Sequence, residues 1–123
     1  ESLILGKSMQ HALERADAYI NAGADAVMIH SKERSGEDIK EFCLKFRSTN
    51  KNTPIVVVPS TYNHIKETEF IEWGVNIVIY ANHMLRAAYP AMINVAKKIL
   101  KNERSLEIEK KITPIKEIIN LIK

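Results

Sequence analysis

The sequence predicts a parallel α/β fold, and more narrowly the second half of a (β/α)8 barrel. Three short apolar runs, at about 24–29, 55–58 and 75–80, alternate with segments whose apolar residues recur at helical spacing. Such alternation is typical of parallel sheets, in which right-handed crossovers lay the strands down in one direction and leave edges that need neighbours. A complete barrel needs about 250 residues. Because the chain has 123 residues, its three strand and helix units suit half of a barrel.

Composition indicates one partial domain spanning residues 1–123, with a tail helix at about 113–123. Hydrophobic residues make up 46% of the chain, and a net charge of +3 arises from Lys and Arg interleaved with Asp and Glu. This pattern argues against a nucleic-acid partner. No apolar run is long enough to span a bilayer and the N-terminus lacks the layout of a signal peptide, so we expect no membrane association and a cytoplasmic location.

Two further features concern the context of the chain. Residues 1–5 have the character of the end of a strand, and the chain opens without methionine, which suggests a fragment. Cys43 is the single cysteine and lies in a helical pattern. We therefore expect it to be a small core residue in a reducing compartment rather than a catalytic thiol.

The first helix and strand lead to the main functional candidate. Ser8 is a suitable N-cap for a helix over about 9–22, and Gly23 ends that helix. The next strand ends at Ile29 and is followed by His30. In a parallel α/β protein the strand body is buried on both faces, and the chemistry collects where the strand stops. His30 is therefore a candidate ligand-binding residue. The alternative is a histidine at the edge of the core, hydrogen-bonded to backbone.

The next two units repeat the pattern. A start resembling a capping box at 35–38 precedes a second helix, and a strand over 55–58 follows Pro54. A short third helix over 66–73 leads to the strand at 75–80. The apolar face of the second helix consists of Ile39, Phe42, Cys43 and Phe46.

The last part of the chain is predicted to be helical. Apolar residues recur at helical spacing from about Met84 to Leu100, and Pro90 is expected to break or kink this helix. A charged connector at 101–111 separates it from a final helix that starts at 113–114. Side chains expected to pack in the core or against another subunit are Phe70, Trp73, Met84 and Met92.

Polar residues near the other strand ends are weaker candidates. Lys32 shares the side of His30 only if the strand continues regularly, because adjacent strand residues point to opposite faces. Asn82 and His83 either orient a substrate or support the loop backbone. Arg86 is expected in the first turn of a helix, where it either binds phosphate or remains solvated.

Three more side chains, one tyrosine and two histidines, have the residue types of site residues. Tyr62, in the loop after the second strand, either lines the mouth of the site or caps the barrel. His11 and His64 lack the spacing of metal ligands, so we expect both at the surface.

Five stretches of the chain resemble the phosphoenolpyruvate mutase family of the isocitrate lyase superfamily. They are 18–32, with Ala-Gly-Ala-Asp-Ala and Ile-His-Ser-Lys; 57–62, with Val-Val-Pro-Ser-Thr-Tyr; 78–83, with Val-Ile-Tyr-Ala-Asn-His; 85–90; and 115–118. The resemblance covers the whole chain in order. The His-Ser-Lys strand end separates mutases from lyases, which usually have a glutamate at the position of His30.

The resemblance implies interconversion of phosphoenolpyruvate and phosphonopyruvate, small-molecule substrates of phosphonate biosynthesis, with Mg²⁺ as cofactor. It assigns His30 to the phosphoryl or phosphonyl oxygens. Ser60, Asn82 and Arg86 are weaker candidates for substrate contact, and of these only Ser60 is matched to a family position. Ser60 replaces the usual threonine of the family. The family's metal ligands and acidic residues belong to the first half of the barrel. No metal ligand and no certain catalytic residue is therefore expected in this chain, and the chain alone is expected to be inactive. The family also implies a homo-oligomer that exchanges the segment 84–100 between subunits.

Two alternatives stay open. Phosphonopyruvate hydrolase shares the fold and the His-Ser-Lys strand end but transfers the phosphonyl group to water; Ala81 and the segment 85–90 favour the mutase. The other alternative is a non-catalytic half-barrel module that binds a partner or itself through exposed strand edges and apolar helix faces.

Overall fold

The structure is a computed structural model that describes residues 1–121. It divides into two compact units, the first spanning residues 1–81 and the second starting at Asn82. The last two residues of the expected tail helix, 122 and 123, lie outside the described residues. Each unit is considered by itself.

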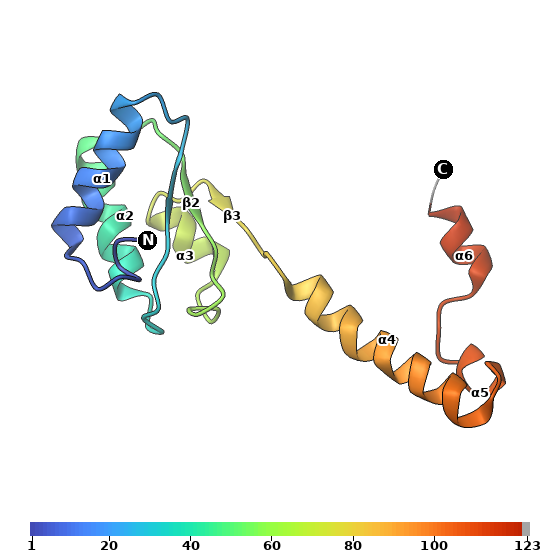
Figure 1. Cartoon of the computed structure of the whole chain (residues 1–123). Coiled ribbons are helices and arrows are strands. Elements are labelled where there is room, and N and C mark those ends of the chain that lie inside the picture. The colour runs from blue at the N-terminus through green and yellow to red at the C-terminus, as the bar shows by residue number, and fades with distance from the viewer. Residues whose placement is uncertain (122–123) are drawn as a thin grey trace. The chain divides into compact units, whose positions relative to one another are not determined.

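The first unit contains a three-stranded parallel sheet, and each strand follows a helix along the chain (Figure 1). The strand order is β1-β2-β3, and Val27 aligns with Ile55, while Val56 aligns with Ile77. This confirms the predicted alternation and the parallel sheet. The elements are α1 (Met9–Asn21), β1 (Val27–Ile29), α2 (Glu37–Thr49), β2 (Ile55–Val57), α3 (Glu67–Glu72) and β3 (Ile77–Val78).

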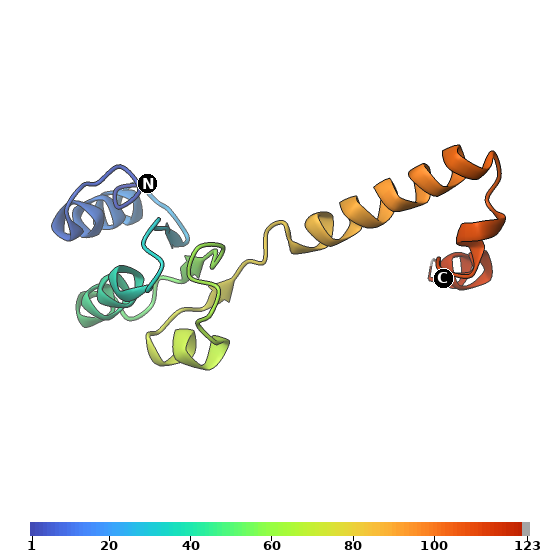
Figure 2. The same cartoon turned by 90° about the horizontal axis from the view of Figure 1, so that it is seen from below.

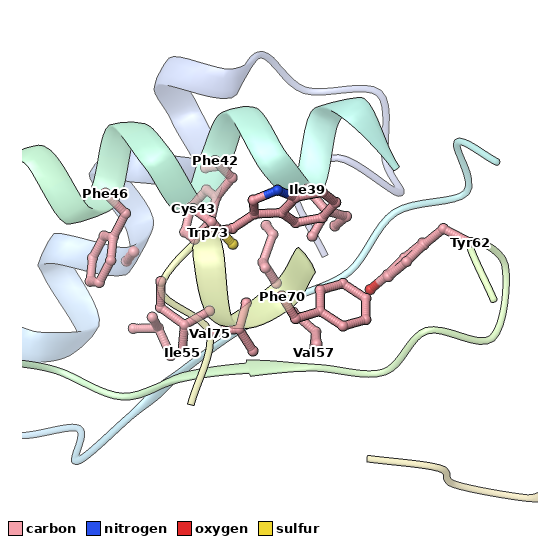
Figure 3. Packing of buried hydrophobic residues seen from close by; sticks show 14 of the residues in the cluster. Ile39, Phe42, Cys43, Phe46, Ile55, Val57, Tyr62, Phe70, Trp73 and Val75 are labelled. Atoms are coloured by element: carbon pink, nitrogen blue, oxygen red, sulfur yellow. The ribbon is translucent and has the colours of Figure 1, made fainter. Parts of the chain in front are cut away.

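Helices cover one face of this sheet and form the core with it (Figures 2 and 3). The predicted apolar face of α2 is confirmed: Ile39, Phe42, Cys43 and Phe46 are all buried. Phe42 and Phe46 stack with ring centroids 5.7 Å apart. The other main members of the core are Val27, Ile29, Ile55, Val57, Tyr62, Phe70, Trp73 and Val75. The core therefore lies between the sheet and its helices, as in the wall of a barrel.

The opposite face of the sheet is apolar but uncovered at its edges. Met28 is 56% exposed and Ile77 is 47% exposed, whereas Val56 between them is buried. The expectation that every strand is buried on both faces is therefore right for β2 and wrong for β1 and β3. The physical reason is that, within the described residues, no second layer packs on this face. We refer to Met28, Val56 and Ile77 as the uncovered sheet face.

Two local expectations are wrong. Residues 2–6 form turns rather than a strand, because their amides bond to nearby carbonyls, as in Leu5 N to Glu1 O at 3.0 Å. The start of α2 is not a capping box. Its N-cap is Gly36, in the left-handed region with φ of 76°, and the Gly36 amide donates to Glu33 Oε2 at 3.1 Å. The first amide of the helix, that of Glu37, donates to Ser35 Oγ at 3.2 Å, so two side chains upstream of the helix take the place of the expected capping box.

At the amino ends of the strands, one arginine holds several loops together. Arg47, near the end of α2, is half-buried. Its guanidinium donates to the carbonyls of Gly74 (2.7 and 2.9 Å), Thr53 (2.8 Å) and Asn50 (3.1 Å) and to Asn76 Oδ1 (2.6 Å). These acceptors precede β2 and β3, so the contacts, called here the Arg47 clamp, fix where both strands begin.

The second unit contains α4 (His83–Asn102), α5 (Leu106–Glu109) and α6 (Ile115–Asn120). Helix α4 continues through Pro90, so the break, one of the two outcomes expected there, does not occur. The expected charged connector contains the short helix α5, whose Ile108 is buried and which packs against α4. Within the described residues, no helix combines the length and apolar character needed to cross a membrane.

Helix α4 has an exposed apolar surface. None of its residues is buried. Phe70 and Trp73 are core residues, as predicted. Met84 and Met92 are 82% and 56% exposed, so the prediction that they pack in the core of this chain is wrong. The other large exposed apolar residues of α4 are Leu85, Tyr89, Ile93, Ile99 and Leu100.

Candidate functional site

His30 follows the last residue of β1 and lies at the carboxyl end of the sheet. Strand alternation places it on the same face as Met28. It is half-buried and lines a cavity of about 890 Å³ that runs along β1 and α1. His30 Nδ1 is buried and makes no hydrogen bond to any described residue. The half-exposed ring can therefore present its other nitrogen, Nε2, to a ligand in the cavity.

The residues next to His30 are held by a side-chain latch. Ser31 is 2% exposed, and its hydroxyl donates to Asp38 Oδ2, in the first turn of α2. The same hydroxyl accepts from the Glu33 amide at 3.0 Å. Because it joins the end of β1 to the start of α2, the latch fixes the backbone on the carboxyl side of His30.

Tyr62, in the loop after β2, packs next to His30. The two ring centroids are 6.2 Å apart, with the planes at 51°. Tyr62 has no exposed surface, which favours the capping role over lining of the cavity. Burial raises the pKa of the Tyr62 hydroxyl to about 12, partly offset by the nearby Val58 backbone. The side chain therefore remains a neutral phenol at physiological pH.

The weaker candidates come from the loop after β2 and from the second unit. Ser60 is exposed and lines a separate polar pocket of about 540 Å³. Its other lining residues are Arg34, Thr61, Asn63 and His64. Asn82 and Arg86 belong to the second unit, where Asn82 is the N-cap of α4 and its carbonyl accepts from the Arg86 amide at 2.9 Å. Both side chains are exposed.

The lysine after the His30 strand and two other histidines complete the polar candidates of the first unit. Lys32 and His64 are exposed. His11 is half-buried, and its Nδ1 lies 3.1 Å from Ser2 Oγ, so the expected surface position is wrong for His11. The turn at the N-terminus folds over α1 and covers this ring.

Cys43 is inert in this environment. It is buried, and burial raises the pKa of its thiol to about 12. The thiolate needed for nucleophilic attack or metal binding is therefore disfavoured, which agrees with the predicted core role.

The described residues do not by themselves suit Mg²⁺. This ion needs several oxygen ligands in octahedral geometry. Among residues 1–121, no three His, Cys, Asp or Glu side chains gather into a metal site. The carboxylate of Asp38 contacts the residue after His30: its Oδ2 accepts from Ser31, and its Oδ1 is buried without a hydrogen bond to the described residues.

Sequence reasoning overlooked Asp38 as a partner of the strand end. The available signals were its place in the first turn of α2 and the serine directly after His30.

The parallel sheet with its helices is typical of part of a (β/α)8 barrel, and a histidine stands at one of its strand ends. Comparison with known proteins then gives the family. The model of the phosphoenolpyruvate phosphomutase family matches residues 1–100. The chain therefore belongs to the phosphoenolpyruvate phosphomutase family.

Individual relatives agree with this assignment. The phosphoenolpyruvate phosphomutase of Tetrahymena pyriformis is 37% identical over 121 residues, which cover 98% of this chain and 39% of that protein. The crystal structure of the phosphomutase of Streptomyces platensis subsp. rosaceus is 39% identical and superposes with a TM-score of 0.84, covering 94% of this chain and 39% of that one. A structure of phosphonopyruvate hydrolase in complex with oxalate and Mg²⁺ is 37% identical with a TM-score of 0.86, covering 98% and 42%. The chain thus spans about two fifths of the length of these relatives.

Proposed function

We propose that this chain provides the carboxyl-terminal half of the barrel of an enzyme that interconverts phosphoenolpyruvate and phosphonopyruvate. The single observation that carries the proposal is the placement of His30, a half-buried imidazole at the carboxyl end of a barrel strand and on the wall of a cavity. A barrel enzyme binds its substrate at this end of the strands.

In this proposal His30 donates a hydrogen bond from Nε2 to a phosphoryl or phosphonyl oxygen. A hydrogen bond to a charged oxygen is shorter and stronger than one between neutral groups. A donor fixed in place before the reaction stabilises the charge that develops on the transferred group. The Ser31–Asp38 latch and the contact with Tyr62 support His30 from behind. Ser60, Asn82 and Arg86 are proposed as secondary contacts of the same substrate.

Mg²⁺ is part of the proposal as a cofactor whose ligands lie outside the described residues. What supports it is the hydrolase relative, whose structure contains Mg²⁺ and oxalate. Because residues 1–121 offer no group of three suitable side chains, we assign no step of the reaction to the metal here. We also expect the chain alone to be inactive.

The proposal further includes a single partial domain over 1–123, a cytoplasmic location in phosphonate biosynthesis, and a homo-oligomer. The exposed apolar residues of α4, such as Met84, Leu85 and Leu100, favour burial against a second copy of the chain. In this arrangement the segment 84–100 is exchanged between subunits.

Two other functions have specific support. The hydrolase structure matches this chain as well as the mutase structure does, which favours phosphonopyruvate hydrolysis as the second candidate. The uncovered sheet face, with Met28 and Ile77 exposed, favours a non-catalytic interaction module as the third.

The test is a phosphorus NMR assay of phosphonopyruvate with Mg²⁺. It compares this chain, the full-length protein that contains it, and full-length His30→Ala. We expect phosphoenolpyruvate from the full-length protein, none from the chain alone, and a rate at least about a hundredfold lower in His30→Ala, as for loss of one charge-stabilising donor. Free phosphate instead would identify a hydrolase. No reaction in the full-length protein would favour the interaction module, and full activity in His30→Ala would reject the role of His30.

A further inference from the structure

The packing behind His30 assigns a role to Tyr62, and this inference rests on the proposed function of His30. The imidazole has a cavity side and a core side: the residue is half-buried and lines the cavity, while Nδ1 is buried. Tyr62 is fully buried and does not line the cavity, yet its ring lies 6.2 Å from that of His30. Tyr62 therefore contacts the imidazole from the core side.

Packing has to orient this imidazole, because polar contacts within the described residues do not. Many functional histidines are oriented by a hydrogen bond from the second ring nitrogen to a carbonyl or carboxylate. His30 Nδ1 makes no such bond to residues 1–121. The carboxylate of Asp38 does not supply one either: its Oδ2 accepts from Ser31, and its buried Oδ1 makes no hydrogen bond to the described residues. The latch fixes the backbone after His30 but leaves rotation about the side-chain bonds open.

Tyr62 is itself rigidly held. Its ring meets Phe70 edge to face, with centroids 6.2 Å apart at 72°, and Phe70 meets Trp73 in the same way at 5.4 Å and 87° (Figure 3). On its other side Tyr62 packs against Gly36, where an added Cβ would lie 3.4 Å from Tyr62 Cβ. An aromatic row thus runs from the core to His30, with Tyr62 as its last member.

We propose that Tyr62 is a positioning residue for His30, whose buried ring holds the imidazole in the orientation that presents Nε2 to the cavity. The contribution comes from the aromatic ring, because the buried Tyr62 hydroxyl makes no hydrogen bond to the described residues. Loss of the ring frees the imidazole to rotate, and a misplacement of about 1 Å in a catalytic group can lower a rate by about a hundredfold.

The experiment uses steady-state kinetics of the full-length protein with phosphonopyruvate. Tyr62→Leu is expected to lower kcat by about ten- to a hundredfold with little change in KM, because the substrate is still bound by the rest of the site. Tyr62→Phe keeps the ring and is expected to restore kcat. Tyr62→Met, which fills more of the space, serves if the leucine variant does not fold, and is expected to behave like it.

Phe46→Leu is the matched control. It removes a ring from the same buried core, but Phe46 stacks on Phe42 and lies outside the aromatic row that holds Tyr62. It should lower the thermal midpoint about as much as Tyr62→Leu while leaving kcat unchanged. An equal loss of kcat in Phe46→Leu would show that general loosening of the core, and not positioning, is responsible.

A readout besides activity is the NMR spectrum of the imidazole nitrogens of His30. We expect one set of signals in the parent and in Tyr62→Phe, and broadened or duplicated signals in Tyr62→Leu. Unchanged signals and kcat in Tyr62→Leu, or a full loss in Tyr62→Phe, would overturn the inference. Failure of the proposed function is distinguishable, because it appears as full activity of His30→Ala, whereas failure of this inference alone leaves His30→Ala inactive and Tyr62→Leu active.

Discussion

Removal of the Arg47 clamp should strongly destabilise the first unit. Arg47→Met keeps most of the apolar stem and deletes the guanidinium, which makes five hydrogen bonds to loops at the amino ends of β2 and β3. A hydrogen bond that involves a charged group contributes roughly 1.5–3 kcal/mol. Bonds that share one donor group are not additive, and Arg47 is only half-buried, so we expect a loss of about 3 kcal/mol in the free energy of unfolding.

The assay is unfolding in urea, because an uncharged denaturant does not screen the guanidinium. With an m-value of about 1.5 kcal/mol/M, a loss of about 3 kcal/mol lowers the midpoint by about 2 M. Arg47→Lys should recover less than half of this loss, because a single ammonium cannot reach acceptors that the planar guanidinium spans.

Lys45→Met is the matched control on the same helix. Lys45 forms an exposed ion pair with Glu41 at 2.6 Å, and such pairs contribute less than about 1 kcal/mol. The reasoning is refuted if Arg47→Met shifts the urea midpoint no more than Lys45→Met does.

Two other perturbations test the structure. Gly36→Ala should lower the free energy of unfolding by about 1–3 kcal/mol, because Gly36 has φ of +76° and an added Cβ would meet Ile65 Cδ1. Gly23→Ala is the control for the backbone cost alone, because Gly23 has φ of +97° and an added Cβ would meet nothing within 4 Å. Equal losses of unfolding free energy in the two variants would disprove the contact with Ile65. Burial raises the pKa of the Cys43 thiol from 9.0 to about 12, so its contribution to stability is complete below about pH 9 and is lost as pH rises toward 12. The fall of unfolding free energy over this range should be smaller in Cys43→Ala, and an identical slope would contradict the shift.

Much of the fold could be predicted because it is encoded locally. Helix α1 begins after Ser8 as expected, with the serine hydroxyl accepting from the His11 amide at 3.2 Å. The apolar face of α2 and the run 55–57 also encode their burial directly. What could not be predicted depends on partners distant in sequence. The run at 75–80 forms only two residues of strand, Ile77 and Val78, which pair with β2 and, among the described residues, with no further strand.

The candidate site shows the same division. The position of His30 at a strand end followed from the pattern of apolar residues, and it was found there. The support behind it was not predictable, because Asp38 and Tyr62 meet the strand end through the tertiary fold and lie in segments whose local pattern is ordinary. The prediction that His11 lies at the surface was wrong for the same reason. Its ring contacts Ser2, which belongs to a turn that no periodicity in the sequence indicates.

The Arg47 clamp has a consequence for how enzymes of this kind diverge. It secures the strands at their amino ends, whereas His30 lies at the carboxyl end of the sheet. Loops at the carboxyl end can therefore accumulate substitutions without loosening the strand register. This separation gives a physical reason why one scaffold can serve both a phosphomutase and a hydrolase of phosphonopyruvate: new chemistry can evolve at one end while folding remains secured at the other.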